Sequence, residues 1–273
     1  MAASGARMVE VGTTNRTRLS DYKGALDAGA SLVMKVHRSN FDVVGFTEEV
    51  GIAELAGLCH PRAVPLLYDL GSGLLRSRPG LGEACVTEAL EAGADLVLFS
   101  GDKLLGGPQC GVVAGRRVLV ERLRRHPLMR MVRPGKLTLL ALEATLRAWA
   151  RDPEGAPVPA AEMLSRSPKV LRERAESLAS ALRGVLASTA AVSVVAVDGL
   201  VGGGSAPGLA LPGFAVAVRP PSGESELAEA LRRGDPAVVG RIEGGALLLD
   251  VRTLLAGDEG RIVDAFRRAG AGG

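Results

Sequence analysis

Short apolar runs alternate with stretches of helical pattern through the first 150 residues, and this alternation limits the possible folds more than any other feature. Four runs have the length and composition of buried strands, at residues 32–36, 65–70, 95–100 and 111–114. Helical patterns occupy residues 47–58, 83–92 and 137–150. This order predicts crossover units and an α/β fold with a mostly parallel sheet. Ligands bind at the carboxyl ends of strands in such sheets, so we expect function just after Val36, Leu70 and Ser100.

The composition changes after residue 150. Residues 151–160, RDPEGAPVPA, contain three prolines and a glycine and predict a linker. Beyond it we expect helices at residues 168–187, 224–233 and 258–269, strands at 191–197 and 214–219, and a hairpin of residues 238–242 and 246–251. We therefore predict two domains, residues 1–150 and a small C-terminal α+β domain of residues 151–273.

Composition excludes several classes of protein. Apolar residues make up 47% of the chain and charged residues 23%, as in globular proteins. No apolar run approaches the roughly 18 residues of a membrane-spanning helix, and the first ten residues contain no apolar segment typical of a secretory signal. The three cysteines lie far apart without a CxxC pair, which argues against a disulfide framework or a zinc site. We expect a cytoplasmic protein without a membrane partner.

The net charge of +3 is unevenly distributed. The segment from Arg116 to Lys136 contains eight basic residues and one acidic residue, Glu121, so the rest of the chain is net negative. Such a segment attracts phosphate-bearing ligands or nucleic acid, although it is equally compatible with a solvated helix face. A pure nucleic-acid binder is disfavoured because the chain has only one Trp, two Tyr and five Phe for stacking on bases.

Residues 99–111, FSGDKLLGGPQCG, are the densest candidate site. Lys103 follows the end of a predicted strand within a Gly-flanked turn, where partial burial lets a lysine act as a nucleophilic amine. Such a lysine suits a Schiff base with pyridoxal 5′-phosphate, and Ser100 is placed to hydrogen-bond the cofactor phosphate. An isolated SxxK is more often an ordinary surface turn. The β-lactamase interpretation is discarded because neither SDN nor KTG follows.

Two further segments end at the same predicted sheet edge. Asp69 ends the strand before that of Lys103, where a carboxylate can pair with a pyridinium nitrogen, although a helix cap or turn is an equal alternative. In KVHRSNF, residues 35–41, Asn40 or Ser39 is a candidate donor to the cofactor ring oxygen and His37 a candidate stacking or relay group. The combination of these residues at different strand ends is more specific than any one of them.

The chain resembles bacterial L-seryl-tRNA(Sec) selenium transferase, or selenocysteine synthase. The resemblance rests on VEVGTTNRT (9–17), MKVHRSNF (34–41), YDLGSG (68–73), FSGDKLLGGPQCG (99–111), HPLMRMVRPGKLTLLALEATLR (126–147), GGGSAPGLALP (202–212) and VVGRIEGGALLLDVRTL (238–254). It implies a fold-type-I pyridoxal-phosphate-dependent transferase, with residues 1–150 as the C-terminal part of the large domain. It also implies Lys103 as the Schiff-base lysine, Asp69 as the ring-nitrogen partner, Ser100 near the phosphate, and Arg130 and Arg133 as ligands of the selenium-donor anion.

The implied reaction converts L-seryl-tRNA(Sec) to L-selenocysteinyl-tRNA(Sec) with selenophosphate, through a dehydroalanyl-tRNA intermediate. The family builds homo-oligomers from dimers, and we expect the same here. One departure is that family members carry a long region before the VEVGTTNRT motif, so the chain resembles an N-terminally truncated member with an incomplete sheet. Two alternatives therefore stay open: a related pyridoxal-phosphate lyase acting on a small amino acid or amino sugar, and a catalytically inactive fragment that only contacts a partner.

Overall fold

The computed structural model describes residues 4–78, 80–153, 157–186, 190–221 and 223–270, and these fall into two compact units. The first unit comprises Met1–Ala160 together with Gly202–Leu209. The second comprises Ala161–Val201 and Ala210–Gly273. The loop Gly202–Leu209, which the sequence analysis placed within the C-terminal domain, thus clusters with the first unit, while the predicted division between residues 150 and 151 remains a proposal.

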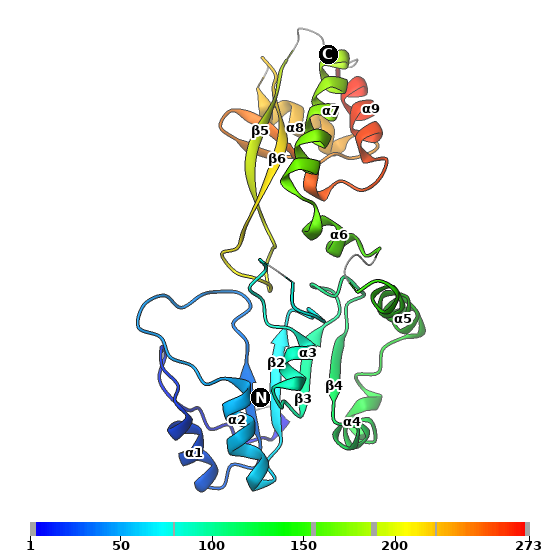
Figure 1. The fold of residues 1–273 in the computed structure, drawn as a ribbon. Helices are drawn as coiled ribbons and strands as arrows, with labels where there is room; N and C mark the ends of the chain where they lie inside the picture. Colours follow the sequence, from blue (N-terminus) through cyan, green and yellow to red (C-terminus); the bar gives the residue numbers. More distant parts are fainter. Residues whose placement is uncertain (1–3, 79, 154–156, 187–189, 222, 271–273) are drawn as a thin grey trace. The chain divides into compact units, whose positions relative to one another are not determined.

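The first unit is built on a four-stranded sheet (Figure 1). Its strands follow the chain in order, β1 (Val33–Val36), β2 (Leu66–Gly71), β3 (Leu96–Ser100) and β4 (Gly111–Gly115). The first three strands are parallel, and β4 runs antiparallel to β3. The four predicted strands and the mostly parallel sheet are confirmed.

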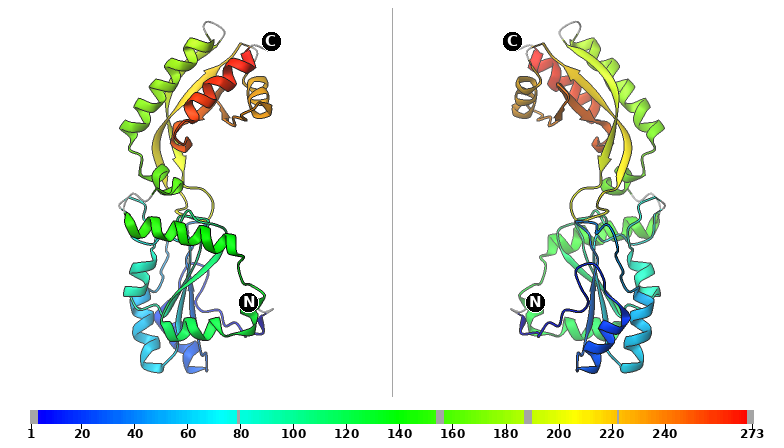
Figure 2. Two further views of the ribbon diagram at one scale, coloured as in Figure 1. Left: turned by 90° about the vertical axis from the view of Figure 1, so that its right-hand side faces the viewer. Right: turned by 90° about the vertical axis from the view of Figure 1, so that its left-hand side faces the viewer.

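Helices connect the parallel strands. Helices α2 (Ile52–Cys59) and η2 (His60–Arg62, a 3-10 helix) lie between β1 and β2, and α3 (Val86–Glu91) lies between β2 and β3. A further helix, α1 (Leu19–Asp27), precedes β1. Helices α2 and α3 lie along one face of the sheet (Figure 2). Buried apolar side chains of α1, α2, β1 and β2, including Leu26, Val33, Leu55 and Leu66, form the core on that side. This packing fixes where the strands end and therefore where the candidate site lies.

Two predicted helix starts are wrong. The helix predicted from residue 47 begins at Ile52, and the helix predicted from residue 83 begins at Val86. Cys85 has an extended backbone and stands as the cap of α3, so Glu83 lies in the preceding loop. The Glu83 carboxylate is buried there and hydrogen-bonded to His37 and Ala206, which are distant in the sequence. The local helical pattern does not reveal these contacts.

The segment after β4 contains α4 (Arg117–Arg124), the 3-10 helix η3 (Pro127–Arg130) and α5 (Lys136–Arg151), which lie beside the β4 edge of the sheet (Figure 1). Helix α5 confirms the helix predicted at 137–150. Trp149 is its buried residue, and the indole Nε1 donates a hydrogen bond of 2.9 Å to the carbonyl oxygen of Leu105. This contact ties α5 to the turn that carries Lys103.

The second unit is an antiparallel sheet with helices on it. After α6 (Pro159–Ser165) come α7 (Pro168–Leu186), β5 (Ala191–Leu200), β6 (Ala210–Arg219), α8 (Glu224–Arg233), β7 (Arg241–Glu243), β8 (Ala246–Asp250), the 3-10 helix η4 (Val251–Thr253) and α9 (Asp258–Gly270). The strand order is β5-β6-β8-β7. Buried residues of α7, α8 and α9, including Leu178, Leu231 and Phe266, share one apolar core with β6 and β8. The predicted elements of this region are present, and residues 154–156 of the predicted linker and Ala187 lie outside the described residues.

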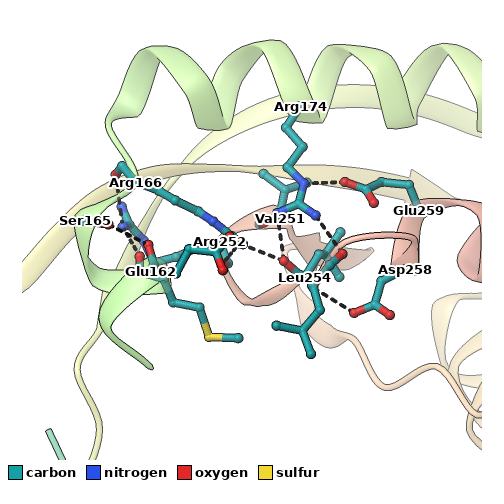
Figure 3. A network of polar contacts seen from close by, with 11 residues as sticks. Glu162, Ser165, Arg166, Arg174, Val251, Arg252, Leu254, Asp258 and Glu259 are labelled. Carbon is teal, nitrogen blue, oxygen red and sulfur yellow. Dashed lines mark hydrogen bonds and ion pairs between the residues drawn. The ribbon is translucent and has the colours of Figure 1, made fainter. Parts of the chain in front are cut away.

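Three arginines hold the helices of this unit to the segment after β8 (Figure 3). Arg252 donates to the carbonyl oxygens of Met163 at 3.0 Å and Pro212 at 2.7 Å. Arg166 and Arg174 each donate to the carbonyl oxygen of Leu254 at 2.7 Å. Arg252 thus connects α6 and β6 to η4 through backbone carbonyls, while its buried Nε has no hydrogen-bond partner among the described residues. No helix in the described part of the chain combines the length and apolarity needed to cross a membrane.

Candidate functional site

The carboxyl ends of the three parallel strands bring the candidate residues to one edge of the sheet. Asp69 of β2 is paired with Val36 of β1 on one side and with Leu98 of β3 on the other. The segments after Val36 and Ser100 therefore begin close to Asp69. The parallel arrangement of β1, β2 and β3 thus places residues of three distant sequence segments next to one another.

Lys103 lies in the turn after β3, and its backbone position is fixed by the neighbouring segments. The N–H of Leu104 donates to the carbonyl oxygen of Ser72 at 2.8 Å, and the N–H of Gly101 donates to that of Cys110, also at 2.8 Å. The first bond holds the turn against the loop after β2. The second closes the turn at the start of β4. The Lys103 side chain is partly buried as a result.

Two glycines provide the space that the Lys103 amine occupies. A Cβ atom added to Gly204 would lie 2.9 Å from both Cε and Nζ of Lys103, closer than real Cβ contacts allow. A Cβ atom added to Gly71 would lie 3.8 Å from Lys103 Nζ and 3.4 Å from Ser39 Oγ. Both glycines have positive φ, +86° and +75°, which also favours glycine there. The structure thus brings Lys103 and Ser39 together between the end of β2 and the loop Gly202–Leu209.

Asp69 is half-buried on β2. Burial alternates along the strand, with Leu66, Tyr68 and Leu70 buried and Asp69 on the other side. Because successive side chains point to opposite faces and Leu66 packs in the core with α2, the Asp69 carboxylate faces away from that core. The carboxylate therefore lies on the opposite face of the sheet.

His37 belongs to a second group of side chains beside this edge. Its Nε2 lies 3.1 Å from a carboxylate oxygen of Glu83, and its Nδ1 lies 3.5 Å from the hydroxyl of Tyr68. The other Glu83 oxygen accepts a hydrogen bond of 2.9 Å from the backbone N–H of Ala206. Burial acts to raise the pKa of Glu83, but the hydrogen bonds from His37 and Ala206 outweigh it and leave that pKa lowered. Burial raises the pKa of Tyr68 to about 12, so its hydroxyl is a neutral donor.

The other predicted site residues lie at the end of β3, after β1 and after α4. Ser100 is the half-buried last residue of β3, paired with Gly111, and Asn40 is exposed after β1. Arg130 ends η3 and Arg133 follows it, and both are exposed. Their predicted role in binding an anion stays a prediction.

The residues at this edge fit a cofactor held by Lys103. Gly71 and Gly204 leave space for the Lys103 amine, and the hydroxyl of Ser39 lies beside it. The fold has a solved counterpart in D-glucosaminate-6-phosphate ammonia-lyase, which is 19% identical, with a TM-score of 0.55 over 98% of this chain and 65% of that chain. The fold is that of the fold-type-I pyridoxal-phosphate-dependent enzymes.

Within this class the family is shown by sequence. The family model described as L-seryl-tRNA selenium transferase matches residues 1–255, and the chain belongs to this family. The cofactor of the family is pyridoxal 5′-phosphate. The resemblance to the family stated from the motifs is therefore confirmed.

Curated relatives agree with this assignment. The L-seryl-tRNA(Sec) selenium transferase of Moorella thermoacetica is 46% identical over 98% of this chain, and that of Geobacter sulfurreducens is 45% identical over 98%. The enzyme of Solidesulfovibrio magneticus is 46% identical over 96% of this chain. The matches span 58%, 59% and 57% of those relatives, respectively, so this chain corresponds to somewhat more than half of their length.

Sequence reasoning missed Glu83. The residue reads as an acidic side chain in the first turn of a helix, a common and unremarkable position. In the structure its side chain is only 2% exposed and contacts both His37 and the loop Gly202–Leu209. The contact to Ala206 joins residues 123 positions apart, so no local pattern announces it.

Proposed function

We propose that this chain takes part in converting L-seryl-tRNA(Sec) to L-selenocysteinyl-tRNA(Sec), with selenophosphate as the selenium donor and pyridoxal 5′-phosphate as cofactor. The observation that carries the proposal is the position of the Lys103 amine at the carboxyl edge of a family-matched sheet, in space left by Gly71 and Gly204. The names of the relatives supply the substrate class. A cytoplasmic location follows from the proposed tRNA substrate.

Bound at this edge, pyridoxal phosphate would supply an electron sink for the α-carbon of the serine. Lys103 would hold the cofactor covalently and, once released by the serine amine, would take the α-proton at its Nζ. Asp69 would keep the ring nitrogen protonated, and Ser100 would donate to the phosphate. Ser39, beside Lys103, and Asn40 remain candidate donors to the ring oxygen, and His37 a candidate relay group.

The reaction exchanges the serine β-hydroxyl for selenium. The Cβ–O bond breaks and the oxygen leaves as water, the selenium of selenophosphate bonds to Cβ, and a water molecule cleaves the Se–P bond and releases phosphate. Arg130 and Arg133 would bind the selenophosphate anion, since arginine pairs well with planar or tetrahedral oxyanions. The basic segment between Arg116 and Lys136 suits a phosphate-rich partner such as tRNA. We further propose that the protein works as a homo-oligomer built from dimers.

The first test is binding of the cofactor. Purified chain is incubated with pyridoxal 5′-phosphate, and the visible absorption spectrum is recorded for the wild type, Lys103→Ala and, as a matched control, Lys169→Ala on α7 of the second unit. We expect a protein-bound band in the wild type and the control, and none in Lys103→Ala. A band that persists in Lys103→Ala contradicts the assigned role of Lys103.

The second test is turnover. The same proteins are given serine-charged tRNA and selenophosphate, and separately free amino acids and amino sugars. Selenium incorporation that depends on tRNA and on Lys103 supports the proposal. Turnover of a free amino compound instead identifies a related lyase, and failure to bind the cofactor at all identifies a fragment without catalytic function.

A further inference from the structure

Glu83 joins two parts of the candidate site that are far apart in the sequence. One carboxylate oxygen contacts His37 Nε2 at 3.1 Å, and the other accepts the Ala206 N–H at 2.9 Å. The side chain is 2% exposed, so water does not compete for either contact. Hydrogen bonds to a buried, ionised carboxylate are stronger than those between neutral groups.

The loop that Glu83 contacts is the one that lies against Lys103. Gly204 approaches the Lys103 side chain so closely that a Cβ would lie 2.9 Å from it, and Ala206 is two residues further on. Ala206 has φ of +43°, a left-handed conformation that costs an alanine free energy. A fixed acceptor for its N–H offsets that cost and holds the loop in one place.

The same carboxylate determines the protonation pattern of His37. An ionised carboxylate only accepts hydrogen bonds, so the ring nitrogen facing Glu83 must carry the hydrogen. In the neutral ring, Nδ1 is then an acceptor facing the hydroxyl of Tyr68, 3.5 Å away. Hydrogen bonds are then donated from the Tyr68 hydroxyl to His37 Nδ1 and from His37 Nε2 to Glu83.

We propose that Glu83 is a positioning residue: it anchors the loop Gly202–Leu209 beside the Lys103 amine and fixes the hydrogen of His37 on Nε2. The anchoring is a property of the chain without cofactor. Its consequence for catalysis rests on the function proposed above, since only a cofactor-binding Lys103 needs a fixed loop beside it.

Nitrogen-15 NMR of the cofactor-free chain tests the anchor. In Glu83→Ala we expect the Ala206 amide to lose hydrogen-exchange protection roughly tenfold or more, the effect of losing a hydrogen bond to a charged group. Glu83→Gln keeps an amide oxygen for the Ala206 N–H, so protection should be largely retained. Its NH₂ group must then donate to His37, which moves the ring hydrogen from Nε2 to Nδ1, and the ring nitrogen shifts report that exchange.

Asp95→Asn is the matched control, because Asp95 is an equally buried carboxylate, also 2% exposed, outside this group. It should leave both the Ala206 amide and the His37 tautomer unchanged. Unchanged Ala206 protection in a folded Glu83→Ala overturns the proposal. If Glu83→Ala does not fold, Glu83→Gln decides: a ring hydrogen that stays on Nε2 overturns it.

Cofactor binding gives a separate measurement. Glu83→Ala should bind pyridoxal phosphate roughly tenfold more weakly than the wild type, with Glu83→Gln restoring most of the affinity. If no protein, including the wild type, binds the cofactor, the function proposed above fails while the NMR result still decides the anchor. Equal affinities of all variants overturn the link between the anchor and Lys103.

Discussion

Gly204 shows how a residue without a side chain shapes a site. The Lys103 amine occupies the volume that any Cβ at this position would take, and the backbone of Gly204 has φ of +86°. Both constraints point to glycine for steric reasons, independent of any chemistry that glycine performs. At the neighbouring Gly203, an added Cβ would have no atom within 4 Å, and φ is not positive. Gly203 can therefore serve as a control position for substitutions at Gly204.

We expect Gly204→Ala to weaken pyridoxal phosphate binding at least roughly tenfold, because the new methyl group displaces the Lys103 amine and strains the loop. Gly203→Ala should bind as the wild type does. Titration of the cofactor followed by absorbance measures both. Equal affinities of the two variants would contradict the position assigned to the Lys103 amine.

Asp95 is a second buried carboxylate with a structural role. Its oxygens accept hydrogen bonds of 2.8 Å from the backbone N–H of Leu66 and from Arg116. Burial acts to raise the pKa of Asp95, but the hydrogen bonds from Arg116 and Leu66 and the charge of His60 outweigh it and lower that pKa. The carboxylate thus links the starts of β2 and β3 to the residue before α4.

We expect Asp95→Ala to lower the free energy of unfolding by about 2–3 kcal/mol at pH 7, mainly because the buried N–H of Leu66 loses its acceptor. A carboxylate whose pKa is lower in the folded than in the unfolded state stabilises the protein at pH values above its unfolded-state pKa of about 4. This stabilisation is lost as the pH falls through the folded-state pKa. The difference between wild type and variant should therefore shrink below about pH 4. Urea unfolding at several pH values measures this difference in the free energy of unfolding. A difference that does not change with pH would refute the electrostatic contribution of the Asp95 carboxylate.

At the level of elements, Trp149 attaches α5 to the turn that carries Lys103. Trp149 is buried and donates to the carbonyl of Leu105, two residues after Lys103, while several other apolar residues of α5 are exposed.

Trp149→Phe should lower the free energy of unfolding by about 1–2 kcal/mol, since the Leu105 carbonyl loses its donor in a buried position. Leu146→Ala, at a more exposed position on the same helix, should change it less. Urea unfolding is followed by circular dichroism, because Trp149 is the single tryptophan of the chain. A smaller loss for Trp149→Phe than for Leu146→Ala would contradict this attachment.

The elements themselves were largely predictable, but their starts were not. Strands β1 to β4 follow from apolar runs, since burial on both faces selects continuous apolar sequence. The starts of α2 and α3 were misplaced because acidic residues near a helix start resemble first-turn residues. Glu83 instead contacts His37 and Ala206, and those partners are supplied by other elements.

At the scale of the whole molecule, the segment from η3 into α5 exposes large apolar side chains. Leu137 is 82% exposed and Met131 81%, and Val132 and Leu140 are also exposed. Clusters of this kind mark surfaces that bind other proteins or further copies of the same chain. The basic residues nearby keep the segment charged as well as apolar.

We expect the purified chain to self-associate as concentration rises, consistent with the proposed homo-oligomer. Leu137→Glu combined with Leu140→Glu should shift the population toward monomer, and a glutamate at position 137 suits the first turn of α5. Leu200→Glu, an exposed apolar position in the second unit, is the control. Sedimentation velocity measures all three proteins, and identical behaviour of the double variant and the wild type would rule out this surface.

Hydrophobic periodicity and local motifs are properties of neighbouring residues. They were therefore enough to predict the class of fold, the strands of the parallel sheet, the family and the choice of Lys103 and Asp69 as candidates. The position of the loop Gly202–Leu209 beside Lys103, and the contacts by which Glu83 joins that loop to His37, became visible only in the folded structure. Glu83 lies 46 positions from His37 and 123 positions from Ala206, so these contacts depend on burial and on close approach between distant segments. Such approaches exist only once the sheet and its connections are assembled.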